Sequence, residues 1–213
     1  MSRGEKAERT YQQILAVSEK LFQEQGYERT SIQDILNELK MSKGAVYHHF
    51  KSKKEILDAI EEEEVIRQRL LFKKLIKEVQ GENALEKIKH VFLKLLASAS
   101  LKAKERMVAH LDPYAVTSDI KAQPEHAKLL AILIEEGITD GSIKTDYPLE
   151  LSEVFFILFT TWTNPILFPR SNEETKRRLT YLQLMMKNLG ADFIEDELIE
   201  KVLAGYEKVG YFE

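Results

Sequence analysis

The chain has 213 residues, of which 44% are hydrophobic and 31% charged, and its formal net charge is −4 at pH 7. This length allows one or two domains, and the absence of cysteine excludes disulfides and thiolate metal sites. The negative net charge argues against a protein that coats nucleic acid without selectivity. Residues 1–9 lack the apolar stretch of a secretory signal, and no apolar run reaches the roughly 20 residues of a membrane helix. We therefore expect a cytoplasmic protein with no membrane partner.

Nearly every segment repeats its apolar residues with the period of a helix, and no long alternation of apolar and polar residues predicts a sheet. The first helix ends at Gly26, which can adopt the left-handed conformation of a helix C-cap. A short second helix begins at Thr30, with Gln33 three residues later as in a capping box. Ser42 is predicted to be the N-cap of a third helix, over residues 42–50.

Longer helices follow the two short ones. Ser52 and Glu55 form another capping pattern at the start of a fourth helix, which runs to about residue 80. The later helices are predicted over residues 83–103, 124–136, 149–168, 173–189 and 195–209. The sequence thus predicts an all-α protein with an N-terminal domain of three helices, residues 1–52, and a larger helical domain, residues 53–213.

The charged residues are divided sharply between two neighbouring segments. Residues 40–54 contain five lysines, two histidines and no acid, whereas residues 55–64 contain six acids and no base. A solvated helix face is the usual explanation of such a charge run. Here the basic segment coincides with a pattern of short helices that is typical of a helix-turn-helix, so DNA is the predicted partner.

The third helix carries the residues predicted to read DNA, because a helix fits the major groove and its first residues approach the base edges. Gly44 has no side chain to hold the helix away from DNA, and Lys43 can donate to phosphate or guanine. Tyr47 and His48 can hydrogen-bond to phosphates or bases, and Thr30 is predicted both to cap its helix and to touch a phosphate. The predicted DNA-facing residues of the third helix are Ser42, Lys43, Gly44, Ala45, Tyr47 and His48, whereas Val46, His49 and Phe50 are predicted to be core.

Residues 30–57 resemble the reading head of the tetracycline-repressor (TetR) family of bacterial regulators. The resemblance extends over roughly residues 5–60, and it rests on the spacing of Thr30, Ile35, Ser42, Lys43, Gly44, Tyr47, His49, Phe50, Lys53 and Ile56. It implies that Lys53 is a phosphate clamp, with Lys51 and Lys54 in weaker supporting roles. Two residues depart from the family pattern, since Lys40 stands at a usual glycine and Ala45 replaces a commoner threonine. A left-handed lysine costs about 1 kcal/mol.

A single reading head offers a small interface, so the mechanism requires a homodimer on a near-palindromic operator in double-stranded DNA. The predicted dimer surface is formed by the helices at 149–168 and 173–189, which correspond to a four-helix interface in the family; the alternative is that these residues are internal core. The larger domain is predicted to bind a small-molecule effector between its helices, although ordinary packing is the alternative for every candidate residue. The candidates are Phe92, Leu96, Met107, His110, Tyr114, Phe155, Phe159 and Trp162.

The resulting prediction is a sequence-specific DNA-binding regulator, a repressor that an effector releases from its operator by displacing the fourth helix. A repressor is preferred to an activator because steric block needs only tight binding, whereas activation also needs a polymerase contact. One alternative is an all-helical carrier without a DNA function. The other is an enzyme, but His110 and Asp112 stand without a nucleophile motif or phosphate loop, so we expect no catalysis, metal or cofactor.

Overall fold

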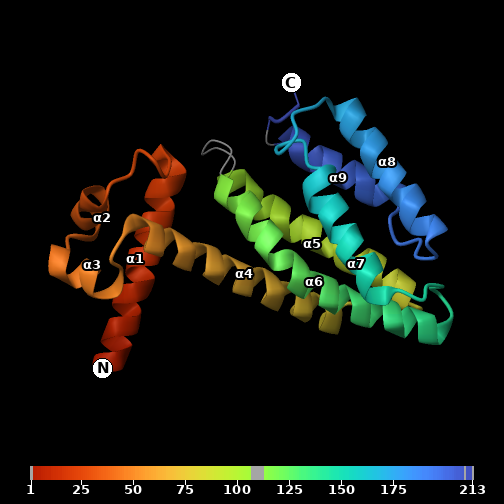
Figure 1. The fold of residues 1–213 in the computed structure, drawn as a ribbon, viewed down its shortest axis with the longest axis horizontal. Helices are drawn as coiled ribbons and strands as arrows, with labels where there is room; N and C mark the ends of the chain where they lie inside the picture. Colours follow the sequence, from red (N-terminus) through yellow and green to blue (C-terminus); the bar gives the residue numbers. More distant parts are fainter. Residues whose placement is uncertain (1, 107–112, 209, 213) are drawn as a thin grey trace. The chain divides into compact units, whose positions relative to one another are not determined.

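The computed structural model of the chain describes residues 2–106, 113–208 and 210–212 (Figure 1). Every regular element in these ranges is a helix, which confirms the predicted all-α class. The helices form two compact units, and the boundary between the units falls within α4 (Lys53–Glu78), after Glu64. None of the described helices combines the length and apolar character that a membrane-spanning helix requires.

The first unit is a small helical domain built from α1 (Arg3–Gln25), α2 (Ile32–Leu39), α3 (Lys43–His49) and the beginning of α4, and it also includes the described residues among 106–118. One apolar core joins these helices, because each contributes the residues of a single face. The outer faces of the short α2 and α3 are therefore left to solvent. The buried core residues are Ile14, Leu15, Phe22, Ile35, Leu36, Val46, Phe50, Ile56 and Leu57.

Side-chain caps define the starts of α2 and α3. Ser42 is the N-cap of α3, as predicted. The predicted cap of α2 is wrong by one residue, because Ser31 rather than Thr30 accepts the hydrogen bond from the Asp34 backbone, at 3.1 Å. Thr30 instead points inward with only 1% of its surface exposed, and its hydroxyl donates to the carbonyl of Gly26 at 2.8 Å. Asp34, and not Gln33, completes the capping box.

The second unit consists of longer helices. After α4 come α5 (Ala84–Arg106), α6 (Pro113–Asp140), α7 (Pro148–Ile157), the π-helical segment η1 (Leu158–Trp162), α8 (Asn172–Asn188) and α9 (Asp196–Lys208). The prediction that a helix begins at Pro124 is wrong, since α6 passes through this proline. Ala122 and Ala127 are buried on either side of Pro124, and this burial holds the helix together across the hydrogen bond that a proline removes. The predicted helix 149–168 is also shorter, because α7 changes to a π-helix at Leu158.

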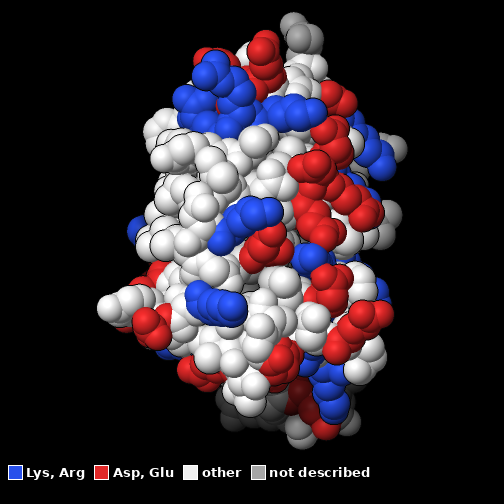
Figure 2. All heavy atoms as spheres, turned by 90° about the vertical axis from the view of Figure 1, so that its right-hand side faces the viewer, with Lys and Arg blue, Asp and Glu red and all other residues white. Residues whose placement is uncertain are grey.

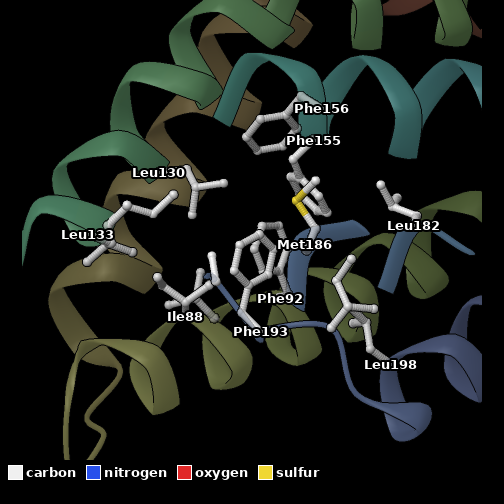
Figure 3. Packing of buried hydrophobic residues seen from close by; sticks show 14 of the residues in the cluster. Ile88, Phe92, Leu130, Leu133, Phe155, Phe156, Leu182, Met186, Phe193 and Leu198 are labelled. Atoms are coloured by element: carbon white, nitrogen blue, oxygen red, sulfur yellow. The ribbon is translucent and has the colours of Figure 1, made fainter. Parts of the chain in front are cut away.

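A cluster of aromatic rings lies within the largely aliphatic core of the second unit (Figure 3). The ring of Phe155 lies 5.1 Å from that of Phe92 and 5.0 Å from that of Phe193, both in edge-to-face geometry, and Phe92 and Phe193 stack at 5.8 Å. Such pairs add specific geometry to the burial of a large apolar area. The rings come from α5, α7 and the segment before α9, so the cluster fixes helices that are far apart in the sequence.

Candidate nucleic-acid interface

The outer face of α3 carries the residues that the sequence predicts to read DNA. Ser42, Lys43, Gly44, Tyr47 and His48 are exposed, and Ala45 is half-buried. Three further residues were predicted to be core. Val46 and Phe50 are buried, whereas His49 is half-buried with its ring 6.3 Å from that of Tyr11.

The turn between α2 and α3 closes through a left-handed Lys40, with φ 53° and ψ 38°. The Lys40 amide donates to the Asn37 and Leu36 carbonyls, and the amide of Met41 donates to Leu36 at 3.3 Å. This is the Schellman arrangement that a glycine usually serves. The turn therefore keeps the geometry expected of the glycine that Lys40 replaces, and α3 leaves it in a defined direction.

Two features of α3 allow a large partner to approach its exposed face closely. A methyl group added at Gly44 would meet nothing within 4 Å, so packing inside this chain does not explain the missing side chain. The ammonium of Lys43 lies 5.3 Å from the centre of the Tyr47 ring, which keeps a cation and a hydroxyl-bearing ring on the same exposed strip. The strip offers donors for phosphates and base edges without using any group of the core.

The beginning of α2 adds a residue that sequence analysis missed. Ser31 is exposed, and its hydroxyl and backbone N–H donate to the Asp34 carboxylate at 2.6 Å and 2.7 Å. These hydrogen bonds lower the pKa of Asp34. The pattern Ser-x-x-Asp is itself a capping-box signal, but the same signal one residue earlier, Thr30 and Gln33, competed with it.

The lysines of the basic segment have different surroundings. Lys54 is exposed and pairs with Asp58 at 2.7 Å, which raises the pKa of the lysine. Lys51 is exposed, and its side chain forms no ion pair within the described part of the chain. Lys53 is half-buried, and its ammonium donates to the backbone carbonyls of Tyr27 and Thr30. The three neighbouring lysines are therefore not equivalent cations.

Comparison with known proteins gives a consistent result. The sequence profile of the family described as "Bacterial regulatory proteins, tetR family" matches residues 14–60, from within α1 to the beginning of α4. The HTH-type transcriptional repressor KstR2 of Mycolicibacterium smegmatis is 29% identical over 167 residues, 71% of this chain and 76% of the relative. The Transposon Tn10 TetC protein of Escherichia coli is 42% identical over 57 residues, 27% of this chain and 29% of the relative. A TetR-family transcriptional regulator from Pectobacterium atrosepticum has the same fold, with a TM-score of 0.62 at 21% identity over 89% of this chain and 97% of the other.

The chain belongs to the TetR family. It is a DNA-binding transcriptional regulator, as the sequence predicts, and its family consists of regulators rather than enzymes. The profile match ends at residue 60, whereas the similarity to the KstR2 repressor extends over 71% of the chain. The likeness to solved structures covers both units and concerns the fold alone.

The candidate effector-binding residues of this TetR-family protein do not form one cluster. Phe92 and Phe155 are buried in the aromatic core, Phe159 stacks on Phe155 at 5.3 Å, and Leu96 packs partly buried against the same core. Trp162 lies elsewhere, with its ring 6.2 Å from that of Tyr181 on α8. Met107 and His110, like Asp112, lie outside the described residues, and Tyr114 is described only as part of α6. Among the described residues, no group of three histidines or acids is placed to hold a metal ion.

The outer faces of α7 and α8 expose large apolar side chains. Ile157 of α7 is 52% exposed, and Tyr181 and Leu184 of α8 are 56% and 51% exposed. An open groove of about 1050 Å³ runs along α8; Trp162, Tyr181 and Leu184 are its large apolar lining residues, and most of the other lining residues, such as Arg178, are charged. Figure 2 shows the molecule from the side on which α8 lies in Figure 1, and uncharged side chains are interspersed there with basic and acidic ones. Large exposed apolar side chains framed by charged ones are typical of an interaction surface.

Proposed function

We propose that this TetR-family protein is a repressor that binds a near-palindromic DNA operator as a homodimer and is released from it by a small-molecule effector. The observation that carries the proposal is the exposed face of α3, where Lys43, Gly44 and Tyr47 lie outside the core of their own domain. A helix presented in this way enters the major groove. A DNA-bound dimer acts on the chromosome, which supports the expected cytoplasmic location.

Specific roles follow for the residues of α3. Lys43 donates to a phosphate or a guanine, and Tyr47 and His48 hydrogen-bond to phosphates or base edges. Gly44 and Ala45 allow the helix to approach closely, and Ser42 donates from the start of the helix. Thr30 is not included, although the sequence predicts it, because its side chain is buried and its hydroxyl binds within the loop.

The proposed dimer is formed by α7 and α8. Its support is the exposed apolar side chains of both helices and the groove along α8, which a second copy of the chain would fill. Two reading heads are also needed for useful operator affinity, because a single helix-turn-helix buries little surface. The double variant Ile157→Asp and Leu184→Asp is expected to halve the mass measured by analytical ultracentrifugation. Ile132→Asp, on the equally exposed Ile132 of α6, is the control and leaves the mass unchanged.

The second unit is the proposed effector-binding domain. Its support is the size and aromatic content of its core, around Phe92, Phe155 and Phe159, and the name "repressor" of a relative that spans both units. α4 belongs to both units, so a ligand that moves α4 in the second unit also acts on the first. A coupling of about 2.7 kcal/mol weakens operator affinity roughly 100-fold. If the affinity for the operator is the same in the presence and absence of each effector tested, the protein is a regulator that these effectors do not release from DNA.

The first experiment is a titration of the protein with DNA from upstream of its own gene and its neighbours, at several salt concentrations. About eight phosphate contacts per dimer give a slope of log affinity against log salt near −7. Lys43→Ala and Tyr47→Ala are expected to lower specific affinity by about tenfold or more, whereas Lys208→Ala, in the exposed end of α9, leaves it unchanged. A folded dimer that binds no fragment specifically supports the alternative of an all-helical carrier.

A further inference from the structure

The ammonium of Lys53 is held by the backbone of another segment. Its Nζ donates to the carbonyl of Tyr27 at 2.7 Å and to the carbonyl of Thr30 at 2.9 Å, and it lies 4.0 Å from the centre of the Tyr27 ring. An ammonium has three donors, so two of the three are used inside the domain. Hydrogen bonds from a charged donor at these distances are among the strongest that a side chain makes.

The carbonyls bound by Lys53 belong to the loop that sets the start of α2. Thr30 directly precedes Ser31, the N-cap of α2. The same loop is attached to α1 on its other side, because the ring of Tyr27 packs edge-on against Phe22 at 5.1 Å and the Thr30 hydroxyl donates to the carbonyl of Gly26. The first turn of α4, through Lys53, thus ties the end of α1 to the beginning of α2.

We infer that Lys53 is a positioning residue, which fixes α2 and with it the direction of α3, rather than a phosphate contact. This inference rests on the proposed DNA-reading function of α3. α3 is anchored at its end by Phe50, whose ring stacks on that of Tyr11 at 5.0 Å. The Lys53 hydrogen bonds supply the corresponding anchor for α2. A reading helix is useful only if it is presented rigidly, and loosening α2 lets the pair of helices rotate relative to α1.

The neighbouring lysines support this distinction. Lys51 and Lys54 are exposed on the same short segment, and in the described structure the ammonium of Lys54 donates to Asp58 and not to the α1–α2 loop. If a positive charge at this end of the domain were all that DNA binding required, the exposed lysines would supply it without the half-buried ammonium of Lys53. The backbone partners of Lys53 therefore indicate a role inside the reading head.

The salt dependence of operator binding separates the two roles. Lys53→Met keeps the apolar stem and removes the donors, and we expect about a tenfold loss of affinity at every salt concentration with an unchanged slope. Loss of a phosphate contact in each head would instead make the slope shallower by about 1.8 per dimer, and that result overturns the inference. Lys53→Arg keeps the charge but not a compact ammonium between the two carbonyls. We expect it to lose affinity by about tenfold as well, whereas an affinity equal to wild type overturns the inference.

Hydrogen exchange in the free protein tests the same inference without DNA. Lys53→Met and Lys53→Arg are expected to speed exchange of the Thr30 and Ser31 amides by about tenfold, while Lys51→Met, the control that also removes one charge, leaves them unchanged. Unchanged exchange in the Lys53 variants overturns the inference. Since this measurement does not involve an operator, it distinguishes failure of the positioning role from failure of the proposed DNA-binding function. If Lys53→Met does not fold, Lys53→Arg decides both measurements.

Discussion

The two units of this protein specify their structures in different ways. In the reading head, the short helices α2 and α3 each begin at a serine cap, and α2 ends at a left-handed residue, so local signals mark almost every boundary. In the second unit, α8 also begins at a serine cap, but α6 runs through Pro124 and α7 changes to a π-helix at Leu158, against the local signals. The comparison teaches that short helices depend on their caps, whereas long helices in a bundle are determined by the surface they bury.

The largest effect is expected from a cavity in the second unit. Phe155 is fully buried and packs against four other rings, so Phe155→Ala should destabilise this unit by about 4 kcal/mol. The single tryptophan, Trp162, lies in the second unit, so its fluorescence during urea unfolding measures the change. Ile132→Ala, at a half-exposed position of α6, serves as control and should cost less than about 0.5 kcal/mol. Similar costs for both variants would mean that the aromatic cluster does not organise the unit.

A backbone contact in the second unit gives the next largest effect. Gly190 has a φ of 86°, and its carbonyl accepts a hydrogen bond from the Lys144 amide at 2.9 Å. A Cβ at position 190 would lie 1.8 Å from the Lys144 carbonyl oxygen, so Gly190→Ala should cost about 3 kcal/mol. At Gly205, within α9, an added Cβ meets nothing within 4 Å, and Gly205→Ala should instead stabilise by about 0.5–1 kcal/mol. Thermal unfolding of the two variants should therefore move in opposite directions.

Capping tests the reading head. Ser31→Ala should destabilise α2 by about 1 kcal/mol, because the N-cap hydroxyl accepts from the backbone of Asp34. The sequence pattern instead favours a cap at Thr30 with Gln33 as its partner. Because the structure does not use this pair, Gln33→Ala should change stability little. Amide exchange of α2 resolves the two variants within the first unit. A larger effect at Gln33 than at Ser31 would restore the cap predicted from sequence.

The left-handed residue between α2 and α3 should show a gain rather than a loss. Lys40→Gly relieves a positive φ of 53° and should stabilise the first unit by up to about 1 kcal/mol, with unchanged DNA contacts from α3. The measurement is the urea concentration at the midpoint of unfolding of the reading head, monitored through the NMR signals of the α2 amides. Asn37→Gly, within the same helix but at an ordinary helical position, should lower the midpoint. A loss of stability in Lys40→Gly would show that the lysine side chain contributes more than its backbone costs.

The smallest effect is a dependence of the α2 cap on pH. Hydrogen bonds from Ser31 lower the pKa of Asp34 below its value in the unfolded chain, so the carboxylate stabilises the fold above the unfolded pKa. That contribution is lost as the pH falls through the lowered folded pKa. NMR titration of Asp34 should therefore give a lower midpoint in wild type than in Ser31→Ala. Equal midpoints in the two proteins would contradict the capping-box hydrogen bonds.

The all-α class could be predicted from the sequence alone, as could the family, the Ser42 cap and the exposed face of α3. These features depend on residues within a few positions of one another, and the side chains at such spacings meet in any helix. The boundaries of α2 were correct apart from the one-residue shift of the cap from Thr30 to Ser31, and the predicted DNA contacts of α3 stay a prediction.

The folded structure was needed to see which side chains turn inward and what they bind. Thr30 fits a cap by composition, but its position against the end of α1 buries it. Lys53 fits a phosphate clamp by its place in the family pattern, yet its partners Tyr27 and Thr30 lie 26 and 23 residues earlier in the chain. Pro124 marks a helix start by local rules, but burial on both sides carries α6 across it. Each of these outcomes depends on contacts between segments that are far apart in the sequence. A hydrogen bond or buried surface formed by such a contact outweighs a local conformational preference of about 1 kcal/mol.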